Sequence, residues 1–383
     1  MKKILIFSLA YFPHVGGAEI AIKEITDRID DIEFHLITLR FENEQQEERM
    51  GNVLVHRIGN GASYLQKILF VPRAAGFAAR LNQQHHYDAF WAMMSYMLFP
   101  IVLLRNRGIR TPYLLSLQEG DPWGRMFTRW FILPLRPVLS FGFRHACRVQ
   151  TISTFLAVWA ARMGFAQEIG VIPNGVDLSR FTEMRHPSLV TAGVVNLITA
   201  SRLVHKNALD DVIRSLVLLP ENIQFVIYGS GPDEAELQRL SEELRVSDRV
   251  LFKGYIAHAA LAQAFATAHI FIRPSRSEGM GNAFIEALAV GLPVIATQEG
   301  GIADFLFDEK RNPNKPTTGW AVDVNSPEQI AYAVKDIMTN PEKVTRVRRN
   351  GLALVREKYD WNTISRQMHV LFETVCKAST ILA

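Results

Sequence analysis

Apolar and polar positions follow two alternating periods along almost the whole chain. Short apolar runs such as 3–10 and 195–200 have the length of buried strands. Between such runs, stretches such as 208–218 repeat apolar residues every three or four positions, which is typical of amphipathic helices. Strand-like runs that alternate with helix-like ones predict parallel sheets joined by crossover helices. The pattern therefore predicts an α/β fold.

The alternation runs through the chain twice. We expect a first series with a helix at 18–29 and strands at 3–10, 33–38, 89–93, 113–117 and 148–152. The second series has expected strands at 195–200, 224–228, 250–252, 270–273 and 293–296, and helices at 208–218, 233–244 and 283–290. Turn-forming residues at 173–177 separate the two series. We therefore predict two Rossmann-like domains, 1–173 and 174–360, that face a ligand-binding cleft.

Size and composition agree with two soluble domains. At 383 residues, the chain exceeds the size at which a single core keeps growing, and 48% apolar with 21% charged residues excludes disordered and fibrous classes. Its two cysteines, Cys147 and Cys376, form no Cys-x-x-Cys pair and fit a reducing compartment. The apolar stretch 90–104 falls short of the roughly 20 residues that a membrane span needs. We expect a cytoplasmic protein.

Positive charge is concentrated in the first half. The net charge is only +4, yet residues 49–167 contain 14 Lys or Arg against three acids. Two segments within this region, 64–81 and 125–148, combine arginines with many aromatic and aliphatic residues. This combination suits an anionic membrane interface, although the same segments also fit core helices whose arginines are solvated. No nucleic-acid-binding motif is present, so nucleic acid is not an expected partner.

Residues 274–296 form the most informative segment. Their pattern predicts a strand, a loop, a helix and a second strand. Gly279 and Gly281 would let the loop approach a ligand closely, and Asn282 is expected to cap the helix behind them. Free N–H groups at such a helix start would bind a phosphate. Glu278 and Glu286 are expected to line the same pocket, although two glutamates at this spacing are usually only solvated charges.

This segment resembles the Glu-x7-Glu signature of retaining family-4 glycosyltransferases, and the similarity extends over nearly the whole chain. The resemblance implies a GT-B fold, with Glu278 at the donor sugar and Glu286 at the nucleotide ribose. It also implies transfer of a hexose from a nucleoside-diphosphate sugar to a hydroxyl of a glycan or lipid-linked acceptor. The setting would be cell-surface polysaccharide or glycolipid biosynthesis. GT-B enzymes generally need no divalent ion, so no metal or other cofactor is expected.

Further motifs match the same family. Arg202 and Lys206 resemble the pair that binds the donor diphosphate, and Lys206 stands where an anion would offset its place beside a helix start. Asn207 is expected to cap that helix. The segments 174–177 and 359–361 resemble the interdomain marker and the terminal helix, which implies that residues 361–383 pack back on the first domain.

Glycine-rich turns complete the expected donor site. Gly229 and Gly231 follow a strand and resemble the nucleotide-side loop, whereas Gly16 and Gly17 resemble the loop that approaches the phosphates from the first domain. The expected donor-binding residues are thus Gly16, Gly17, Gly229, Gly231, Gly279, Met280, Gly281, Asn282, Ala283 and Glu286. The expected catalytic residues are Glu278, Arg202, Lys206 and Asp121.

One segment departs from the family. Many members have a histidine after the fourth N-terminal strand, where this chain has Gln118 and Glu119. Asp121 is expected to point into the cleft instead. His85 and His86 lack the carboxylate or cysteine companions of a metal site.

Two other functions stay open on the sequence alone. A GT-B-type nucleotide-sugar epimerase would act without an acceptor, and a non-catalytic module would bind the nucleotide sugar without turnover. For the transferase, we expect a nucleotide sugar, an acceptor and an anionic membrane surface as partners. Its expected location is the cytoplasm, with peripheral association to the inner membrane face.

Overall fold

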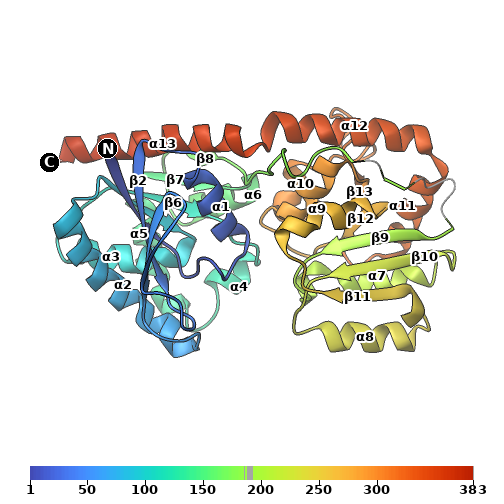
Figure 1. Ribbon diagram of the computed structural model, residues 1–383, viewed down its shortest axis with the longest axis horizontal. Helices are drawn as coiled ribbons and strands as arrows, with labels where there is room; N and C mark the ends of the chain where they lie inside the picture. The colour runs from blue at the N-terminus through green and yellow to red at the C-terminus, as the bar shows by residue number, and fades with distance from the viewer. Residues whose placement is uncertain (185, 188–192, 383) are drawn as a thin grey trace. The chain divides into compact units, whose positions relative to one another are not determined.

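The computed structural model describes residues 1–184, 186–187 and 193–382, and within these the chain forms two compact units. Unit 1 consists of Met1–Asn174 and Trp361–Ala383, and unit 2 of Gly175–Asp360 (Figure 1). The limit between them lies one residue after the expected one. Each unit contains a largely parallel sheet with packed helices, which confirms the predicted α/β class and the two Rossmann-like units.

Unit 1 has, within its described residues, an eight-stranded sheet ordered β3-β4-β2-β1-β5-β6-β7-β8. Its strands are β1 (Lys2–Phe7), β2 (Ile32–Leu39), β3 (Glu47–Met50), β4 (Val53–Ile58), β5 (Ala89–Met93), β6 (Tyr113–Leu117), β7 (Arg148–Thr151) and β8 (Ile169–Val171). All neighbouring pairs are parallel except β3 and β4. The sequence pattern did not predict the β3–β4 hairpin. Strand β3 consists mostly of charged residues that are exposed or only partly buried, so it lacks the apolar run of a buried strand.

The helices of unit 1 cover both faces of this sheet (Figure 1). They are α1 (Gly17–Thr26), α2 (Tyr64–His85), α3 (Leu98–Asn106), α4 (Trp123–Phe127), α5 (Arg136–Arg144), α6 (Thr154–Arg162) and α13 (Trp361–Leu382). Helix α3 packs against both α2 and α5, whereas α1 packs against α13. No helix among the described residues is long and apolar enough to cross a membrane.

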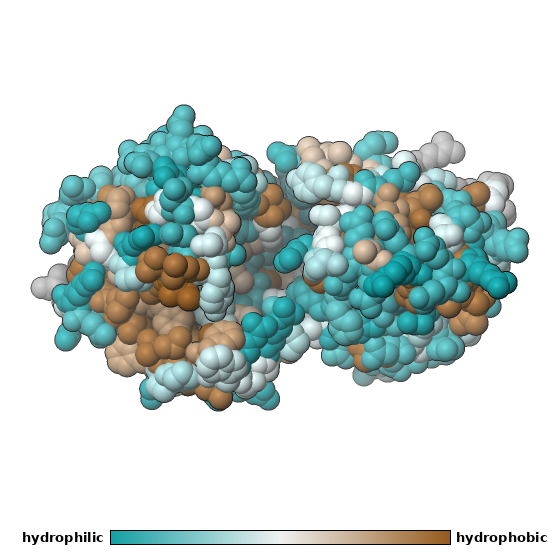
Figure 2. Space-filling model, turned by 90° about the horizontal axis from the view of Figure 1, so that it is seen from below, coloured by the Kyte–Doolittle hydropathy of each residue, from teal (hydrophilic) through white to brown (hydrophobic). Residues whose placement is uncertain are grey.

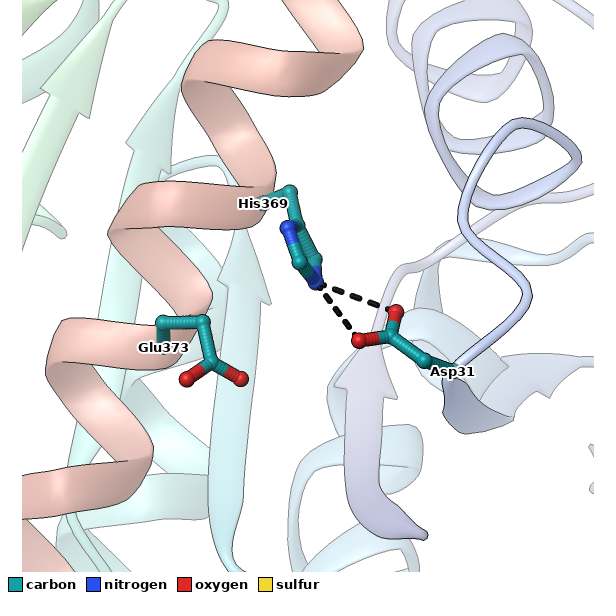
Figure 3. A group of neighbouring side chains, drawn as sticks. All are labelled: Asp31, His369 and Glu373. Carbon is teal, nitrogen blue, oxygen red and sulfur yellow. Dashed lines mark hydrogen bonds and ion pairs between the residues drawn. The ribbon is translucent and has the colours of Figure 1, made fainter.

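The C-terminal helix α13 is fixed to unit 1 by apolar and polar contacts. Phe372 meets the rings of Phe34 and Trp91 edge-on, at centroid distances of 5.7 and 4.9 Å. His369 bonds to Asp31 at 3.0 Å, and Glu373 pairs with Lys2. Figure 3 shows His369 and Glu373 one turn apart on α13, with the imidazole directed at Asp31. Their ligand atoms and those of Asp31 lie within 4.8 Å of one another, but each already has a protein partner.

Unit 2 has, as far as it is described, a six-stranded parallel sheet ordered β11-β10-β9-β12-β13-β14. Its strands are β9 (Val195–Ala200), β10 (Ile223–Tyr228), β11 (Val250–Gly254), β12 (Ile270–Arg273), β13 (Val294–Ala296) and β14 (Trp320–Ala321). Its helices are α7 (Leu209–Leu216), α8 (Glu234–Glu243), α9 (His258–Ala266), α10 (Asn282–Val290), α11 (Pro327–Thr339) and α12 (Pro341–Lys358). The strand order reverses between β9 and β12.

A buried polar network joins β2 and β4 in unit 1. His35 Nδ1 lies 3.1 Å from His56 Nε2 and 2.7 Å from the Tyr87 hydroxyl. Glu33 bonds to His35 Nε2 at 2.9 Å, and Glu47 pairs with His56 Nδ1 at 3.1 Å. Burial lowers the pKa of both imidazoles, since the charged form loses its hydration. The folded chain therefore holds both rings neutral at a pH where an unfolded chain begins to protonate them.

These lowered pKa values predict a loss of stability in mild acid. Unfolded histidine titrates near pH 6.5, so below that pH the unfolded state binds more protons and the free energy of unfolding falls. We expect the melting temperature to drop between pH 7.5 and 5.5, and to drop less in His56→Gln. His145→Gln, which alters an exposed histidine, serves as the control. Equal pH slopes for His56→Gln and the unmodified protein would contradict this prediction.

Candidate functional site

The reversal of strand order in unit 2 defines the candidate site. Strand β9 pairs with β10 on one side and with β12 on the other. Loops that leave two such strands diverge, which opens a crevice at their carboxyl ends. The β9–β12 ladder is short, with pairs Leu197–Ile270 and Ile198–Phe271. Beyond it, Arg273 Nη1 donates to the Ala200 carbonyl at 3.3 Å, so a side chain joins the strand ends.

The loop after β9 carries Arg202, which is exposed, and Lys206, which is half-buried. Gly229 and Gly231 brace this loop from β10. A Cβ at Gly229 would lie 1.8 Å from the Ser201 carbonyl oxygen, and one at Gly231 would lie 2.2 Å from that of Leu203. Only glycine permits this backbone-to-backbone contact. Both glycines therefore shape the loop that presents the two cations.

Asn207 does not cap α7, contrary to the sequence prediction. The helix begins at Leu209, and its N-cap is Ala208 in a left-handed conformation. Asn207 instead ends a 3-10 turn (His205–Asn207), and its amide donates to the Arg202 carbonyl at 2.7 Å. This bond closes the loop between Arg202 and Lys206, because it ties the residue after Lys206 back to Arg202.

Arg276 links this loop to the loop that follows β12. Its backbone N–H donates to the Lys206 carbonyl at 2.7 Å. Its guanidinium bonds to both carboxylate oxygens of Asp210 at 2.8 Å, to Asp211 at 3.1 Å and to the His205 carbonyl at 2.7 Å. Bidentate pairing of this kind fixes orientation as well as distance. The two loops thus form one assembly at the carboxyl ends of the strands.

Glu278 is held from several directions. Its Oε2 accepts from Arg273 Nη2 at 3.1 Å, and its Oε1 accepts from the Gly279 N–H at 3.0 Å. Its backbone carbonyl accepts from the Gly301 N–H at 3.0 Å. Gly300, at a φ of +63°, passes so close that a Cβ would lie 2.0 Å from the Glu278 carbonyl oxygen. Carboxylate and backbone are therefore both fixed.

Helix α10 begins differently from the sequence prediction. Asn282 is its first residue rather than its cap; Gly281 occupies the cap position at a φ of +84° without a side-chain bond. A Cβ at Gly281 would lie 2.5 Å from Arg273 Nη2, so this glycine leaves room for the guanidinium. Gly279 and Met280 before it are buried, and Ala283 after it is half-buried. Gly291 ends the helix in a left-handed conformation.

Glu286 is the fifth residue of α10. It is buried and accepts from His258 Nε2 at 2.7 Å. Burial lowers the pKa of Arg273, and the charges of Glu278 and Glu286 act against that shift. Glu278 contacts this buried guanidinium directly, and the charge of Glu286 also acts on it. Sequence reasoning missed Arg273 and His258, although an arginine directly after the apolar run 270–272 was a signal.

Buried polar atoms that lack a hydrogen-bond partner are concentrated here. Within the described residues, they include atoms at the ends of β9 and β12 and in the loops that follow: Thr199 Oγ1, Ser201 Oγ, Asn207 Oδ1, Arg273 Nε and Ser275 Oγ. An unsatisfied buried polar group costs about 1–3 kcal/mol. Such groups are rare enough in folded proteins that a concentration of them fits a region that takes a polar ligand.

The remaining expected residues belong to unit 1. Gly16 precedes α1 and donates its N–H to Glu19 Oε2 at 2.7 Å, and Gly17 is the first helical residue. Asp121 pairs with Arg125 at 3.6 Å. Glu119 is buried, and burial raises its pKa.

Gln118 and Glu119, which replace the family's histidine, both have internal partners. Glu119 accepts from the backbone N–H groups of Ser95 at 2.6 Å and Gln118 at 2.9 Å. The side-chain amides of Gln118 and Asn174 bond reciprocally at 3.0 and 2.8 Å. Through these hydrogen bonds, both residues stabilise the local structure of unit 1.

Two sequence families match the chain, one in its first half and one in its second. Residues 15–180 match "Glycosyltransferase Family 4", and residues 182–353 match "Glycosyl transferases group 1". The chain belongs to glycosyltransferase family 4. It is accordingly a hexosyltransferase, and the retaining mechanism of this family agrees with the sequence prediction.

Individual relatives cover the full length of this glycosyltransferase. A GDP-mannose-dependent alpha-(1-6)-phosphatidylinositol monomannoside mannosyltransferase of Mycobacterium tuberculosis is 24% identical over 96% of this chain and 97% of its own. A sucrose-phosphate synthase structure from Thermosynechococcus elongatus superposes with a TM-score of 0.83, at 19% identity, over 99% of this chain and 100% of that chain. HepE from Anabaena, in complex with UDP-glucose, gives 0.78 at 19% identity, over 98% and 100%. The structural similarities support the GT-B fold.

The glycine contacts around the loop after β9 predict an asymmetric response to alanine. We expect Gly229→Ala to lower the free energy of unfolding by at least about 1 kcal/mol more than Gly254→Ala, since an overpacked backbone must move. Gly254 is the matched control because it also has a positive φ, +68°, yet a Cβ there meets no atom within 4 Å. Urea unfolding measures both. Equal losses would show that backbone conformation alone sets the cost.

Proposed function

We propose that this enzyme transfers a hexose from a nucleoside-diphosphate sugar to a hydroxyl of a membrane glycolipid or lipid-linked glycan. One observation carries the donor part of the proposal. Glu278 bonds to the buried guanidinium of Arg273, whose charge also acts on Glu286, beside a loop that presents Arg202 and Lys206. Cations suit a diphosphate, and carboxylates suit the hydroxyls of a sugar and a ribose.

In the proposed reaction, Arg202, Lys206 and the start of α10 bind the diphosphate, while Glu278 orients the sugar. The bond between the sugar C1 and the diphosphate oxygen breaks as the acceptor oxygen bonds to C1 on the same face. The acceptor proton passes to the departing diphosphate. Charge on that leaving group grows as the bond breaks, so the cations stabilise the transition state more than the bound donor.

Charge neutralisation by side chains would let the reaction proceed without a divalent ion. Loop 201–207 supplies Arg202 and Lys206, and α10 adds the positive end of its dipole. We accordingly propose that donor binding is the same with a chelator as with Mg²⁺.

The acceptor part of the proposal is supported by a surface on unit 1. Large hydrophobic side chains are exposed at the start of α2 and after α4: Tyr64, Leu65, Ile68, Trp130, Leu133 and Leu135. Trp130 is the most exposed, at 83%. Figure 2 shows hydrophobic residues gathered on the face of unit 1 that is turned to the viewer. Other residues of segment 125–148, including Phe127 and Phe143, are buried and belong to the core.

Part of this surface is anchored to the core of unit 1: the hydroxyl of Tyr96, whose pKa is raised by burial, donates to the Met126 carbonyl at 3.0 Å. Lys67, Arg125 and Arg129 supply positive charge to the same segments. Exposed aromatic residues flanked by cations suit an anionic lipid surface. We propose that unit 1 binds the membrane there.

Substitutions in unit 2 test the donor site. We expect Lys206→Ala to weaken binding of the best donor among UDP-, GDP- and ADP-sugars by about 10- to 100-fold, the value of a charge-assisted hydrogen bond. Glu278→Ala should weaken binding of the sugar nucleotide but leave binding of the nucleoside diphosphate nearly unchanged, because the substitution removes only the contact with the sugar. Calorimetric titration measures both affinities.

Exposed residues of unit 2 provide the controls for this test: Lys335→Ala for the lysine and Glu328→Ala for the glutamate. Both should bind the donor as the unmodified protein does. If Lys206→Ala and Glu278→Ala also bound it unchanged, the assignment of the donor site would be wrong.

Vesicle sedimentation tests the membrane surface. We expect the protein to bind vesicles of phosphatidylglycerol more tightly than vesicles of phosphatidylcholine, and less tightly as salt rises. Arg129→Ala should weaken binding about fivefold, since one cation near an anionic surface contributes about 1 kcal/mol. Trp130→Ser should also weaken it, whereas Tyr332→Ser, on an exposed tyrosine of unit 2, should not. Equal binding to both lipids would refute the anionic membrane site.

A further inference from the structure

Arg273 stands at the point where the sheet of unit 2 reverses its strand order. It is the last residue of β12, and only 5% of its surface is exposed. Burying a guanidinium is costly unless charges and hydrogen bonds compensate for its lost hydration. Nη1 donates to the Ala200 carbonyl, and Nη2 to Glu278 Oε2. One side chain therefore joins the end of β9 to a carboxylate of the proposed donor site.

The surroundings of Arg273 fix the plane of its guanidinium. The group lies over the ring of Phe284, with its central carbon 4.2 Å from the ring centroid. A cation in this position gains from the negative face of the ring. Gly281 leaves the space that Nη2 occupies, since a Cβ there would approach it to 2.5 Å. Residues of the Glu-x7-Glu segment thus shape a seat for an arginine that lies outside that segment.

Glu286, the second glutamate of the Glu-x7-Glu segment, also interacts electrostatically with Arg273. The charges of Glu278 and Glu286 both stabilise the protonated form of Arg273 against the effect of burial. Glu286 itself accepts from His258. Without Arg273, one half-buried and one buried carboxylate would lie in the proposed donor site with no buried guanidinium to offset their charge.

We propose that Arg273 is the positioning residue of the donor site, which orients Glu278 for the sugar without itself touching the donor. The inference rests on the proposed function, because the ligand of Glu278 comes from it. A planar guanidinium meets several acceptors at fixed angles, whereas a lysine ammonium is a flexible point charge. The shape of Arg273, as well as its charge, is therefore required.

Arg273→Lys tests this role, with Arg249→Lys as its matched control. Arg249 is also a buried arginine of unit 2, which donates to the backbone carbonyls of Ile223 and Pro220. Both variants should melt at lower temperature. Only Arg273→Lys should weaken binding of the donor identified by titration, by at least about tenfold, and lower kcat as well. Arg249→Lys should bind that donor within about twofold of the unmodified protein.

A double-mutant cycle separates positioning from general stability. If Arg273 acts through Glu278, adding Arg273→Lys to a Glu278→Gln protein should cost less than about twofold in donor affinity. A merely structural arginine would cost the same tenfold in either background. Phe284→Leu provides a second variant should Arg273→Lys fail to fold, and it should weaken donor binding by an intermediate factor.

The outcomes distinguish this inference from the proposed function. An unmodified protein that binds no nucleotide sugar would overturn the proposed function itself. An unmodified protein that binds a donor, together with additive losses in the cycle or an Arg249→Lys variant as impaired as Arg273→Lys, would overturn the role of Arg273 alone.

Discussion

The site in unit 2 depends on one constraint: β9 and β12 are paired over only a few residues, and the chain must then leave them in different directions. Parallel strands that part in this way expose backbone carbonyls that no further strand can satisfy. A guanidinium is one of the few side-chain groups able to reach such a carbonyl and carboxylates at the same time. Arg273 reaches the Ala200 carbonyl and the Glu278 carboxylate, while Gly281 leaves room for its guanidinium and Phe284 lies against it.

The glycines of the site are best understood as devices for close packing. Gly229, Gly231 and Gly300 each pass a backbone carbonyl at a distance that any side chain would prevent. Through them, the loop after β10 supports the loop after β9, and the loop after β13 supports the loop after β12. Arg276 adds the polar counterpart, because its contacts run to residues on both sides of Lys206. A loop that presents two cations to an anion benefits from this rigidity, because less conformational entropy is lost when the anion binds.

Sequence patterns predicted the regular parts of this architecture well and its junctions less well. Strands such as β9 and β12 were predicted to the residue, because a buried parallel strand is an uninterrupted apolar run with turn formers at its ends. The caps at Asn207 and Asn282 were wrong for a shared reason. Local propensity favours a side-chain cap, but in both cases a residue in a left-handed conformation, Ala208 or Gly281, precedes the helix. Asn207 bonds instead to the Arg202 carbonyl, and Gly281 leaves the space that Arg273 occupies. Arg273 was missed because its partners come from strands and loops up to 73 residues away.

Helix α13 gives the chain an unusual order of assembly. Phe34 and Trp91, near the beginning of the polypeptide, receive one of their aromatic neighbours from Phe372, near its end. A nascent chain emerging from the ribosome can complete unit 2 before unit 1, even though unit 1 starts first. Until the last residues appear, an apolar strip of the first sheet stays open to water and to other proteins. In the half of the enzyme that is made earliest, this strip is therefore the kind of surface that chaperones shield during translation.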